Sequence, residues 1–257
     1  MRPVLGLSWV LLLIILWPGE AAPQAVAEAS ALTELSGSLR ELTARVDPAV
    51  VQIFATTVAP TPGAPDGFAR QRTLGSGVIL HPDGYLVTNA HVVMNARRVQ
   101  VLLSRFADDD DGNGSFRSIL KPRGDLVGAQ VIAVDVETDL AVLKIGRKDL
   151  PHLELADSDD VRKGQLVFAF GSPRGLENSV TMGVISSTAR QRFPEDPMIY
   201  LQTDASINPG NSGGALVNIE GRVVGINTFI VSESGGDEGL GFAVPSNIVR
   251  SVFEQIR

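Results

Sequence analysis

Apolar residues along most of the chain occur in short runs that end at turn-forming residues such as His81-Pro82-Asp83-Gly84. The runs are rich in Val, Ile and Leu and have no long helices between them, which is typical of an all-β fold built as barrels or a sandwich. Residues 58–72 contain three prolines and are expected to form a loop. The predicted strands are Val50–Thr57, Gly75–Leu80, Tyr85–Asn89, Val99–Leu103, Leu126–Val134, Leu140–Ile145, Gln165–Gly171, Val180–Ser186, Ile199–Thr203, Gly214–Asn218, Val223–Thr228 and Gly241–Pro245.

Two segments have the three- to four-residue apolar spacing of a helix. The first lies within an N-terminal helical segment, residues 22–46, and ends at Asp47-Pro48, because the residue before a proline disfavours the helical conformation. We expect it to pack on its own domain, and an oligomer-forming seam is the alternative. The second is a C-terminal helix capped by Ser246. Their apolar stripes are Leu32, Leu35, Leu39, Leu42 and Val46 in the first helix, and Ile248, Val249, Val252, Phe253 and Ile256 in the second.

Residues 1–21 have the layout of a secretory signal, with Arg2, an apolar run from Val4 to Trp17, and the helix breakers Pro18-Gly19. The run is shorter than the ~20 residues that a membrane-spanning helix needs. We therefore expect a cleaved signal, with a retained inner-membrane anchor as the alternative, and an exported or periplasmic protein. Residues 47–257 are then one folded domain.

Charge and residue usage narrow the function further. The chain of 257 residues has 22 Lys and Arg against 29 Asp and Glu, a net charge of −7, which argues against a nucleic acid or an anionic membrane as partner. It has no Cys and only three His, so thiolate metal sites are excluded and an imidazole metal cage is not expected. Gly75-Ser76-Gly77 lacks the third glycine of a dinucleotide loop, and there is no P-loop. No cofactor, metal or ATP is expected.

The segment Gly210-Asn211-Ser212-Gly213-Gly214 carries the clearest chemical signal. A serine hydroxyl becomes a nucleophile only beside a base, and flanking glycines allow a tight turn that points main-chain N–H groups at a developing oxyanion. A simple hairpin turn is the alternative for this segment alone. The segment also fits the α/β-hydrolase elbow, but that fold needs a histidine after the serine, and all three histidines precede Ser212.

The order His, Asp, Ser along the chain is that of the chymotrypsin-type double barrel. His91 follows a predicted strand directly, whereas His81 and His152 lie in turns and are expected at the surface. Asp139 stands at the entry to an apolar strand, where a partly buried carboxylate needs a cation or a donor as partner. Asp135 and Glu137 lie before that strand and are expected to be solvated.

Several motifs in this order resemble the HtrA (Deg) family of trypsin-like serine proteases. The resemblance runs from about Asp47 to Ile256, nearly the whole chain after the N-terminal segments. The motifs are Leu74-Gly75-Ser76-Gly77-Val78-Ile79, Thr88-Asn89-Ala90-His91-Val92-Val93, Asp139-Leu140-Ala141-Val142-Leu143, the segment from Gln202 to Gly214, and Gly239-Leu240-Gly241-Phe242-Ala243-Val244-Pro245.

The resemblance implies an all-β, chymotrypsin-like double β-barrel with N-terminal and C-terminal helices. It implies that His91 is the general base and then acid, that Asp139 orients it, and that Ser212 attacks the peptide carbonyl. The main-chain N–H groups of Gly210 and Ser212, with Asn211, would stabilise the oxyanion.

The same resemblance implies a substrate site. Thr228 matches the position whose hydroxyl supports the triad acid, and Phe229, Ile230 and Val231 would form the edge that receives an extended substrate. Ser206 lies six residues before the nucleophile, at the base of the primary pocket, with Ile207 beside it and no acid to pair a basic side chain. Cleavage after small or medium apolar residues is therefore expected.

The implied function is an ATP-independent serine endopeptidase that acts on unfolded or damaged polypeptides. A peptide-binding, chaperone-like protein with a resting triad is the alternative. No PDZ domain is expected after residue 257, and a homotrimer is the family habit. The insertion Asp108–Gly114 is expected to be an acidic hairpin tip and not a calcium loop, because Leu120 stands where the closing glutamate would be.

Overall fold

The structure is a computed structural model that describes residues 22–60, 68–103, 124–172, 179–208, 210–231 and 238–256. The predicted signal, residues 1–21, and the insertion Asp108–Gly114 lie outside the described residues. The chain divides into two compact units, residues 1–40 and residues 41–257. The first contains most of helix α1 (Ala22–Val46), and the second contains every strand.

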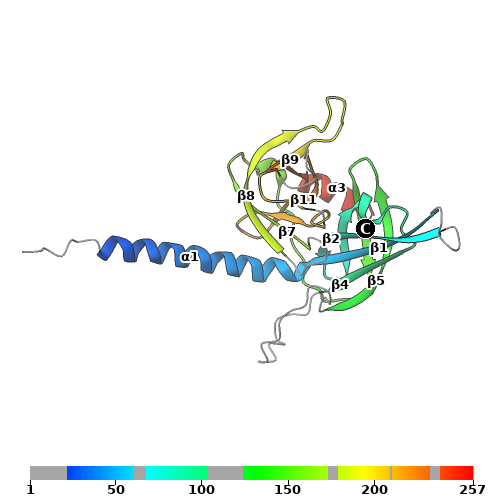
Figure 1. Cartoon of the computed structure of the whole chain (residues 1–257), viewed down its shortest axis with the longest axis horizontal. Helices are drawn as coiled ribbons and strands as arrows, with labels where there is room; N and C mark the ends of the chain where they lie inside the picture. Colours follow the sequence, from blue (N-terminus) through cyan, green and yellow to red (C-terminus); the bar gives the residue numbers. More distant parts are fainter. Residues whose placement is uncertain are drawn as a thin grey trace, which may run out of the picture. The chain divides into compact units, whose positions relative to one another are not determined.

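Six strands form a first closed barrel, in the order β1-β2-β3-β6-β5-β4 (Figure 1). All neighbouring strands are antiparallel, and the barrel closes where β1 pairs with β4. Most of these strands bury consecutive apolar side chains, such as those of residues 78–80 and 140–143, so that both of their faces are covered. The strands are β1 (Val50–Pro60), β2 (Phe68–His81), β3 (Tyr85–Asn89), β4 (Arg98–Leu103), β5 (Asp125–Asp135) and β6 (Leu140–Ile145).

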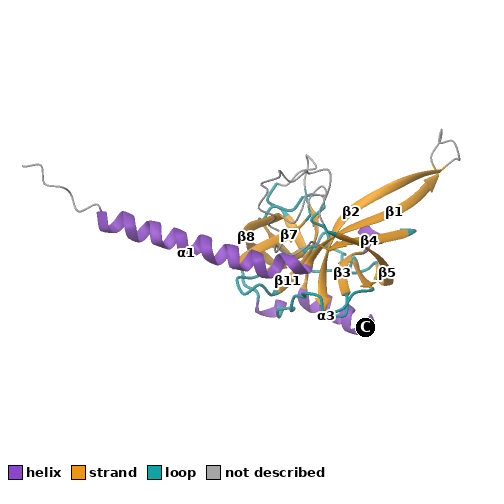
Figure 2. Cartoon of the chain, turned by 90° about the horizontal axis from the view of Figure 1, so that it is seen from below, coloured by secondary structure: helices purple, strands orange, loops and turns teal. Residues whose placement is uncertain are grey.

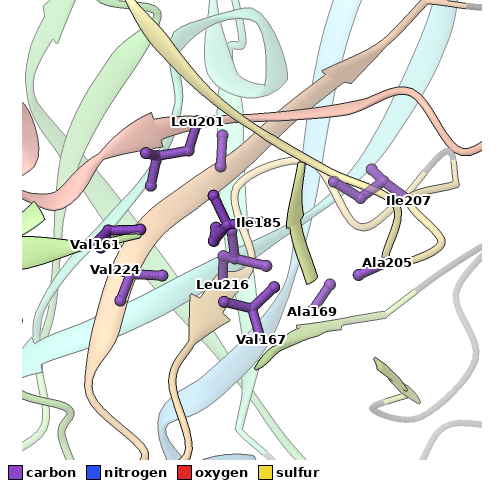
Figure 3. Close-up of a cluster of buried hydrophobic side chains, with 10 residues drawn as sticks. Val161, Val167, Ala169, Ile185, Leu201, Ala205, Ile207, Leu216 and Val224 are labelled. Atoms are coloured by element: carbon purple, nitrogen blue, oxygen red, sulfur yellow. The ribbon is translucent and has the colours of Figure 1, made fainter. Parts of the chain in front are cut away.

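A second closed barrel has the order β10-β11-β12-β9-β8-β7. Figure 3 shows part of its core, where side chains from different strands meet. The strands are β7 (Leu166–Gly171), β8 (Ser179–Arg190), β9 (Tyr200–Thr203), β10 (Ala215–Val217), β11 (Val223–Ile230) and β12 (Gly241–Pro245). The core cluster is Val161, Val167, Ala169, Ile185, Leu201, Ala205, Ile207, Leu216, Val224 and Ala243.

The predicted all-β double barrel with a helix at each end is therefore confirmed (Figure 2). The expectation of a loop over residues 58–72 is wrong at both ends. β1 continues to Pro60 and β2 begins at Phe68, so that Pro60 pairs with Phe68 across a long hairpin. The pairing of Val58 with Arg70 shows that tertiary contacts outweigh the proline signal here.

The helices agree with the apolar stripes only in part. In α1 the last two stripe residues, Leu42 and Val46, are buried, whereas Leu32 and Leu35 are exposed. Packing on the chain's own domain is thus shown for the last turns of this helix. The C-terminal helix α3 (Ser246–Ile256) buries Val249, Val252 and Phe253. Among the helices of the described residues, none has the length and apolarity that a bilayer span requires.

Ser246 has a different role from the predicted one. Its hydroxyl donates to the carbonyl of Ala156 at 2.8 Å, so it ties α3 to the segment between the barrels and does not cap the helix. The described residues of the second unit also contain three short helical turns: η1 (Asp47–Ala49) before β1, α2 (Ala90–Val93) after β3, and η2 (Ser158–Asp160) between the barrels.

Candidate active site

His91 lies in α2, the single helical turn that follows β3, and comes from the first barrel. Its ring Nδ1 lies 2.7 Å from Asp139 Oδ2, and its main-chain N–H donates to Asp139 Oδ1 at 3.0 Å. The imidazole is 45% exposed and the carboxylate 27%. Because a carboxylate only accepts, Nδ1 carries the proton, and the lone pair of Nε2 is free to accept another.

Asp139 sits in the turn between β5 and β6 with a φ of +55°, a conformation that residues other than glycine rarely adopt. The main-chain carbonyl of Asp139 accepts from Asn89 Nδ2 at 2.9 Å and from the Ala90 N–H at 3.0 Å. These bonds hold the turn against β3 and aim the carboxylate at His91. Backbone strain of this kind collects at functional sites, where the surroundings impose it.

The pKa of the Asp139 carboxyl results from opposing effects. Burial alone raises the pKa, but the hydrogen bonds and the charge of His91, together with the hydroxyl of Thr228, outweigh burial and lower it below the ordinary value. The carboxylate is therefore ionised at neutral pH, as it must be to stabilise an imidazolium.

Thr228, in β11 of the second barrel, links the acid to the serine. Its hydroxyl donates to Asp139 Oδ2 at 2.8 Å, and its main-chain carbonyl accepts from Ser212 Oγ at 3.0 Å. Among the described residues, no hydrogen bond joins Ser212 Oγ to the ring of His91. The structure thus brings His91, Asp139 and Ser212 to one place at the seam of the barrels, with the serine hydroxyl turned to Thr228.

The turn from Gly210 to Gly214 leaves two amides free. The first three carbonyls of the turn all accept hydrogen bonds. The Gly210 carbonyl accepts from Ser76 Oγ, the Asn211 carbonyl from the Gly214 N–H, and the Ser212 carbonyl from the Ser76 N–H. The N–H groups of Asn211 and Gly213 donate to Asn208 and Asn227. The N–H groups of Gly210 and Ser212 have no acceptor within the described residues. They are the pair that an oxyanion hole needs.

Asn211 and Gly213 have fixed roles within this turn. The Asn211 N–H donates to Asn208 O at 2.9 Å, so Asn211 does not offer an amide to an oxyanion. Gly213 has a φ of +85°, and a Cβ there would collide with the carbonyl of Ser76 and the hydroxyl of Thr88. Only glycine fits this position.

The predicted pocket residues precede the turn. The carbonyl of Ser206 accepts from the Thr181 hydroxyl at 2.9 Å, and the Ser206 side chain is half-buried. Ile207 is 2% exposed and packs in the core of the second barrel, so its side chain does not line an open surface. Asp204, the nearest acid in the sequence, accepts from the Val184 N–H at 2.7 Å.

The segment Phe229–Val231 is paired on one side. Phe229 and Ile230 pair with β12, and the Val231 N–H donates to Leu240 O. On the other side, β10 begins at Ala215, and the pairing of β11 in that direction reaches only the Asn227 N–H bond to Gly214 O. The Phe229 ring stacks on Phe242 at 4.9 Å and meets Tyr200 edge to face.

The other histidines lie away from this cluster. Within the described residues, the ring of His81 interacts with its neighbours Asp83 and Tyr85, and His152 is exposed. Asp135, expected to be solvated, accepts from the Glu137 N–H and the Thr138 hydroxyl and so shapes the turn before Asp139. Within the described part of the chain, no cluster of three or more His, Cys, Asp or Glu has a geometry suited to a metal.

Sequence reasoning missed Ser76, Thr88 and Asn89 as site residues. All three are polar side chains with no exposed surface, in strands that otherwise bury apolar groups. Buried polar residues need partners, and this was the signal available in the sequence. Which partners they contact depends on how the two barrels pack.

A histidine–aspartate pair and a glycine-flanked serine at the meeting point of two six-stranded barrels define a serine peptidase of the chymotrypsin type. Residues 75–226 match the trypsin-like peptidase domain. The chain belongs to this family, and its relatives are HtrA-type proteases.

Two curated relatives are named probable periplasmic serine endoprotease DegP-like. The protein of Halomonas elongata is 44% identical over 205 residues, which are 79% of this chain and 39% of the relative. That of Pseudomonas fulva is 41% identical over 209 residues, 80% of this chain and 40% of the relative. The chain thus spans about two fifths of the length of these relatives.

Solved structures agree in fold. HtrA-type protease AlgW with tripeptide is 39% identical, with a TM-score of 0.70, over 84% of this chain and 62% of that one. HtrA-type protease AlgW with decapeptide is 38% identical, with a TM-score of 0.69, over 84% of this chain and 66% of that one.

Proposed function

We propose that the protein is an ATP-independent serine endopeptidase whose catalytic residues are His91, Asp139 and Ser212. The observation that carries the proposal is the meeting of these three side chains around Thr228, beside two amides with no acceptor among the described residues. Such a pair of amides has no use in a simple hairpin turn, whereas acyl transfer requires it.

In the proposed reaction, Ser212 Oγ leaves the Thr228 carbonyl and donates to Nε2 of His91. The imidazole takes the proton as the oxygen attacks the peptide carbonyl, and Asp139 stabilises the imidazolium. The N–H groups of Gly210 and Ser212 bind the oxyanion. The same imidazolium then protonates the leaving amine, and water repeats the sequence to release the acyl group.

Substrate choice follows from the residues beside the serine. We infer cleavage after small or medium apolar residues, since Ser206 is neutral and the carboxylate of Asp204 accepts from the Val184 N–H. Peptides ending in Val and in Arg at the cleaved position test this. A kcat/KM that favours Val supports the inference, and a strong preference for Arg contradicts it.

Extended polypeptides are the proposed substrates, added as a strand beside Phe229–Val231. Among the described residues, Phe229 and Ile230 pair with β12 and with no other strand. The names of the relatives support a periplasmic, or at least extracytoplasmic, location. Cleavage of residues 1–21, with anchoring through them as the alternative, and assembly as a trimer belong to the same proposal, as does action on unfolded or damaged proteins.

Casein degradation by the wild type and by Ser212→Ala tests the proposed activity. We expect complete loss in the variant, with loss of labelling by a fluorophosphonate. His152→Ala serves as a matched control, because this exposed histidine lies outside the site. If Ser212→Ala degrades casein at the wild-type rate, the proposed function is wrong.

A second candidate is a peptide-binding, chaperone-like protein with a resting triad. It is favoured by one observation, the hydrogen bond that turns Ser212 Oγ to Thr228 and away from His91. In that case wild type and Ser212→Ala would both leave casein intact, and both would suppress the aggregation of an unfolded protein equally.

A further inference from the structure

Ser76 is a residue of the first barrel that binds the nucleophile turn of the second. It lies in β2 and has no exposed surface. Its N–H donates to Ser212 O at 2.8 Å, and its hydroxyl donates to Gly210 O at 2.6 Å. The hydroxyl also accepts from the Ser172 N–H at 2.9 Å, and the Ser76 carbonyl accepts from the Thr88 hydroxyl. A single side chain thus joins β2, the end of β7 and the turn that holds Ser212.

With these bonds, two peptide groups of the turn are held at both their carbonyl and their N–H. The peptide between Gly210 and Asn211 has its carbonyl on Ser76 Oγ and its N–H on Asn208 O. The peptide between Ser212 and Gly213 has its carbonyl on the Ser76 N–H and its N–H on Asn227 O. The two amides left free, those of Gly210 and Ser212, alternate with the immobilised peptides along the turn.

The orientation of the peptide between Gly210 and Asn211 depends on the Ser76 hydroxyl, because a glycine backbone is not restricted to one conformation. Gly210 has a φ of +106°, and glycine reaches many other backbone conformations at little cost. A change in ψ of Gly210 or in φ of Asn211 that the other angle does not compensate would turn the peptides on either side relative to each other. Those two peptides carry the N–H groups of Gly210 and Ser212.

The surroundings of the hydroxyl are closely packed. A Cβ added at Gly171 would lie 3.0 Å from Ser76 Oγ and 2.8 Å from Asn211 Oδ1. Gly210 and Ser172 are themselves buried. Removal of the hydroxyl would leave the Gly210 carbonyl and the Ser172 N–H without this partner, and a buried polar group in that position moves toward another one.

We propose that Ser76 is a positioning residue, whose hydroxyl fixes the Gly210–Asn211 peptide so that the amides of Gly210 and Ser212 form the oxyanion hole. This inference rests on the proposed peptidase function. It predicts that the hydrogen bond from the Ser76 hydroxyl in the first barrel to Gly210 in the second affects how well the transition state is stabilised.

The test compares Ser76→Ala with Ser246→Ala. Both remove the hydroxyl of a serine with no exposed surface that donates to a main-chain carbonyl, but Ser246 contacts Ala156, away from the site. For Ser76→Ala we expect kcat on a fluorogenic peptide ending in Val to fall by about tenfold to a hundredfold, less than the loss of a whole oxyanion donor. KM should stay within about twofold, because the ground state makes no use of the hole.

A peptide boronic acid ending in Val reports on the hole directly, since its tetrahedral adduct places an oxygen there. Its inhibition constant should rise by the same factor as kcat falls, while Ser246→Ala leaves both unchanged. Equal kcat in Ser76→Ala and wild type, or equal losses in both variants, would overturn the inference.

If Ser76→Ala does not fold, Ser76→Cys decides, because a thiol fits the volume but is a weak donor. A lowered kcat with unchanged KM supports the inference, and a wild-type kcat overturns it. An inactive wild type would instead contradict the proposed function itself, so the two failures are distinguishable.

Discussion

The hydroxyl of Ser212 donates to the main-chain carbonyl of Thr228 at 3.0 Å, while the side chain of Thr228 donates to Asp139 at 2.8 Å. Thr228 therefore contacts both the nucleophile and the acid, through different groups. In the proposed mechanism, the serine hydroxyl must exchange this carbonyl for His91 before it can lose its proton. Since both acceptors are neutral, the exchange replaces one hydrogen bond with another and costs little.

The side chain of Thr228 gives the first prediction. Thr228→Val removes the hydroxyl bond to the carboxylate but keeps the carbonyl that accepts from Ser212. A hydrogen bond to a charged group contributes about 1.5–3 kcal/mol, so kcat should fall by between about tenfold and a hundredfold. Thr228→Ser keeps the hydroxyl and should retain most of the activity. Equal losses in the two variants would show that packing matters here and the hydroxyl does not.

Asp139→Asn should lower kcat by about 10⁴-fold with little change in KM. The side-chain NH₂ would donate where a carboxylate oxygen now accepts, which forces the proton of the imidazole onto Nε2 and blocks transfer from Ser212. Asp83→Asn is the matched control, because Asp83 lies 3.6 Å from His81 in a second His–Asp pair outside the site. Steady-state kinetics of both variants on one peptide provide the comparison, and comparable rates would contradict the role of Asp139.

Alanine substitutions at two glycines with the same φ distinguish the cost of backbone strain from the cost of a steric collision. Gly164 and Gly213 both have a φ of +85°, but a Cβ at Gly164 meets nothing within 4 Å. Gly164→Ala should cost about 1–2 kcal/mol in the free energy of unfolding. Gly213→Ala should cost about 3 kcal/mol or more, since overpacking against Ser76 and Thr88 adds to the strain. Urea unfolding measures both, and equal losses would mean that the turn can move away.

Because Asp47 is partly buried, we expect the free energy of unfolding to depend on pH. Burial raises the pKa of its carboxyl from 3.8 to about 6. The folded state then holds this proton more tightly than the unfolded state, so this contribution is complete below about pH 4 and is lost as the pH rises through about 6. Asp47→Asn should stabilise the protein by about 1 kcal/mol at pH 7.5, a value reduced for the partial exposure of the group, and by almost nothing at pH 4. A pH-independent difference between the unfolding curves of variant and wild type would contradict this.

The strands were predictable because each is a short apolar run bounded by turn residues, and every predicted strand has a counterpart among β1 to β12. The exception in residues 58–72 has a physical cause. Proline and glycine signal local turns, but the hairpin of β1 and β2 gains its stability from cross-strand pairing, which a local pattern does not contain.

Candidate site residues could be chosen from chain order and neighbouring residues, and the structure brings His91 next to Asp139 as the order His, Asp, Ser suggests. The finer geometry was not accessible in this way. The engagement of the Asn211 N–H with Asn208 and the contact of Ser76 with Gly210 both depend on hydrogen bonds that form only in the folded turn. The second of these spans 134 positions along the chain.

The bonds from Ser76 to the nucleophile turn have a consequence for biogenesis. In the proposed enzyme, neither barrel can hydrolyse a peptide by itself. The first barrel supplies the base His91 and the positioning residue Ser76, and the second supplies the attacking oxygen of Ser212. On this proposal, a newly made copy in which only one barrel has folded has no peptidase activity, and activity begins when the two barrels pack together.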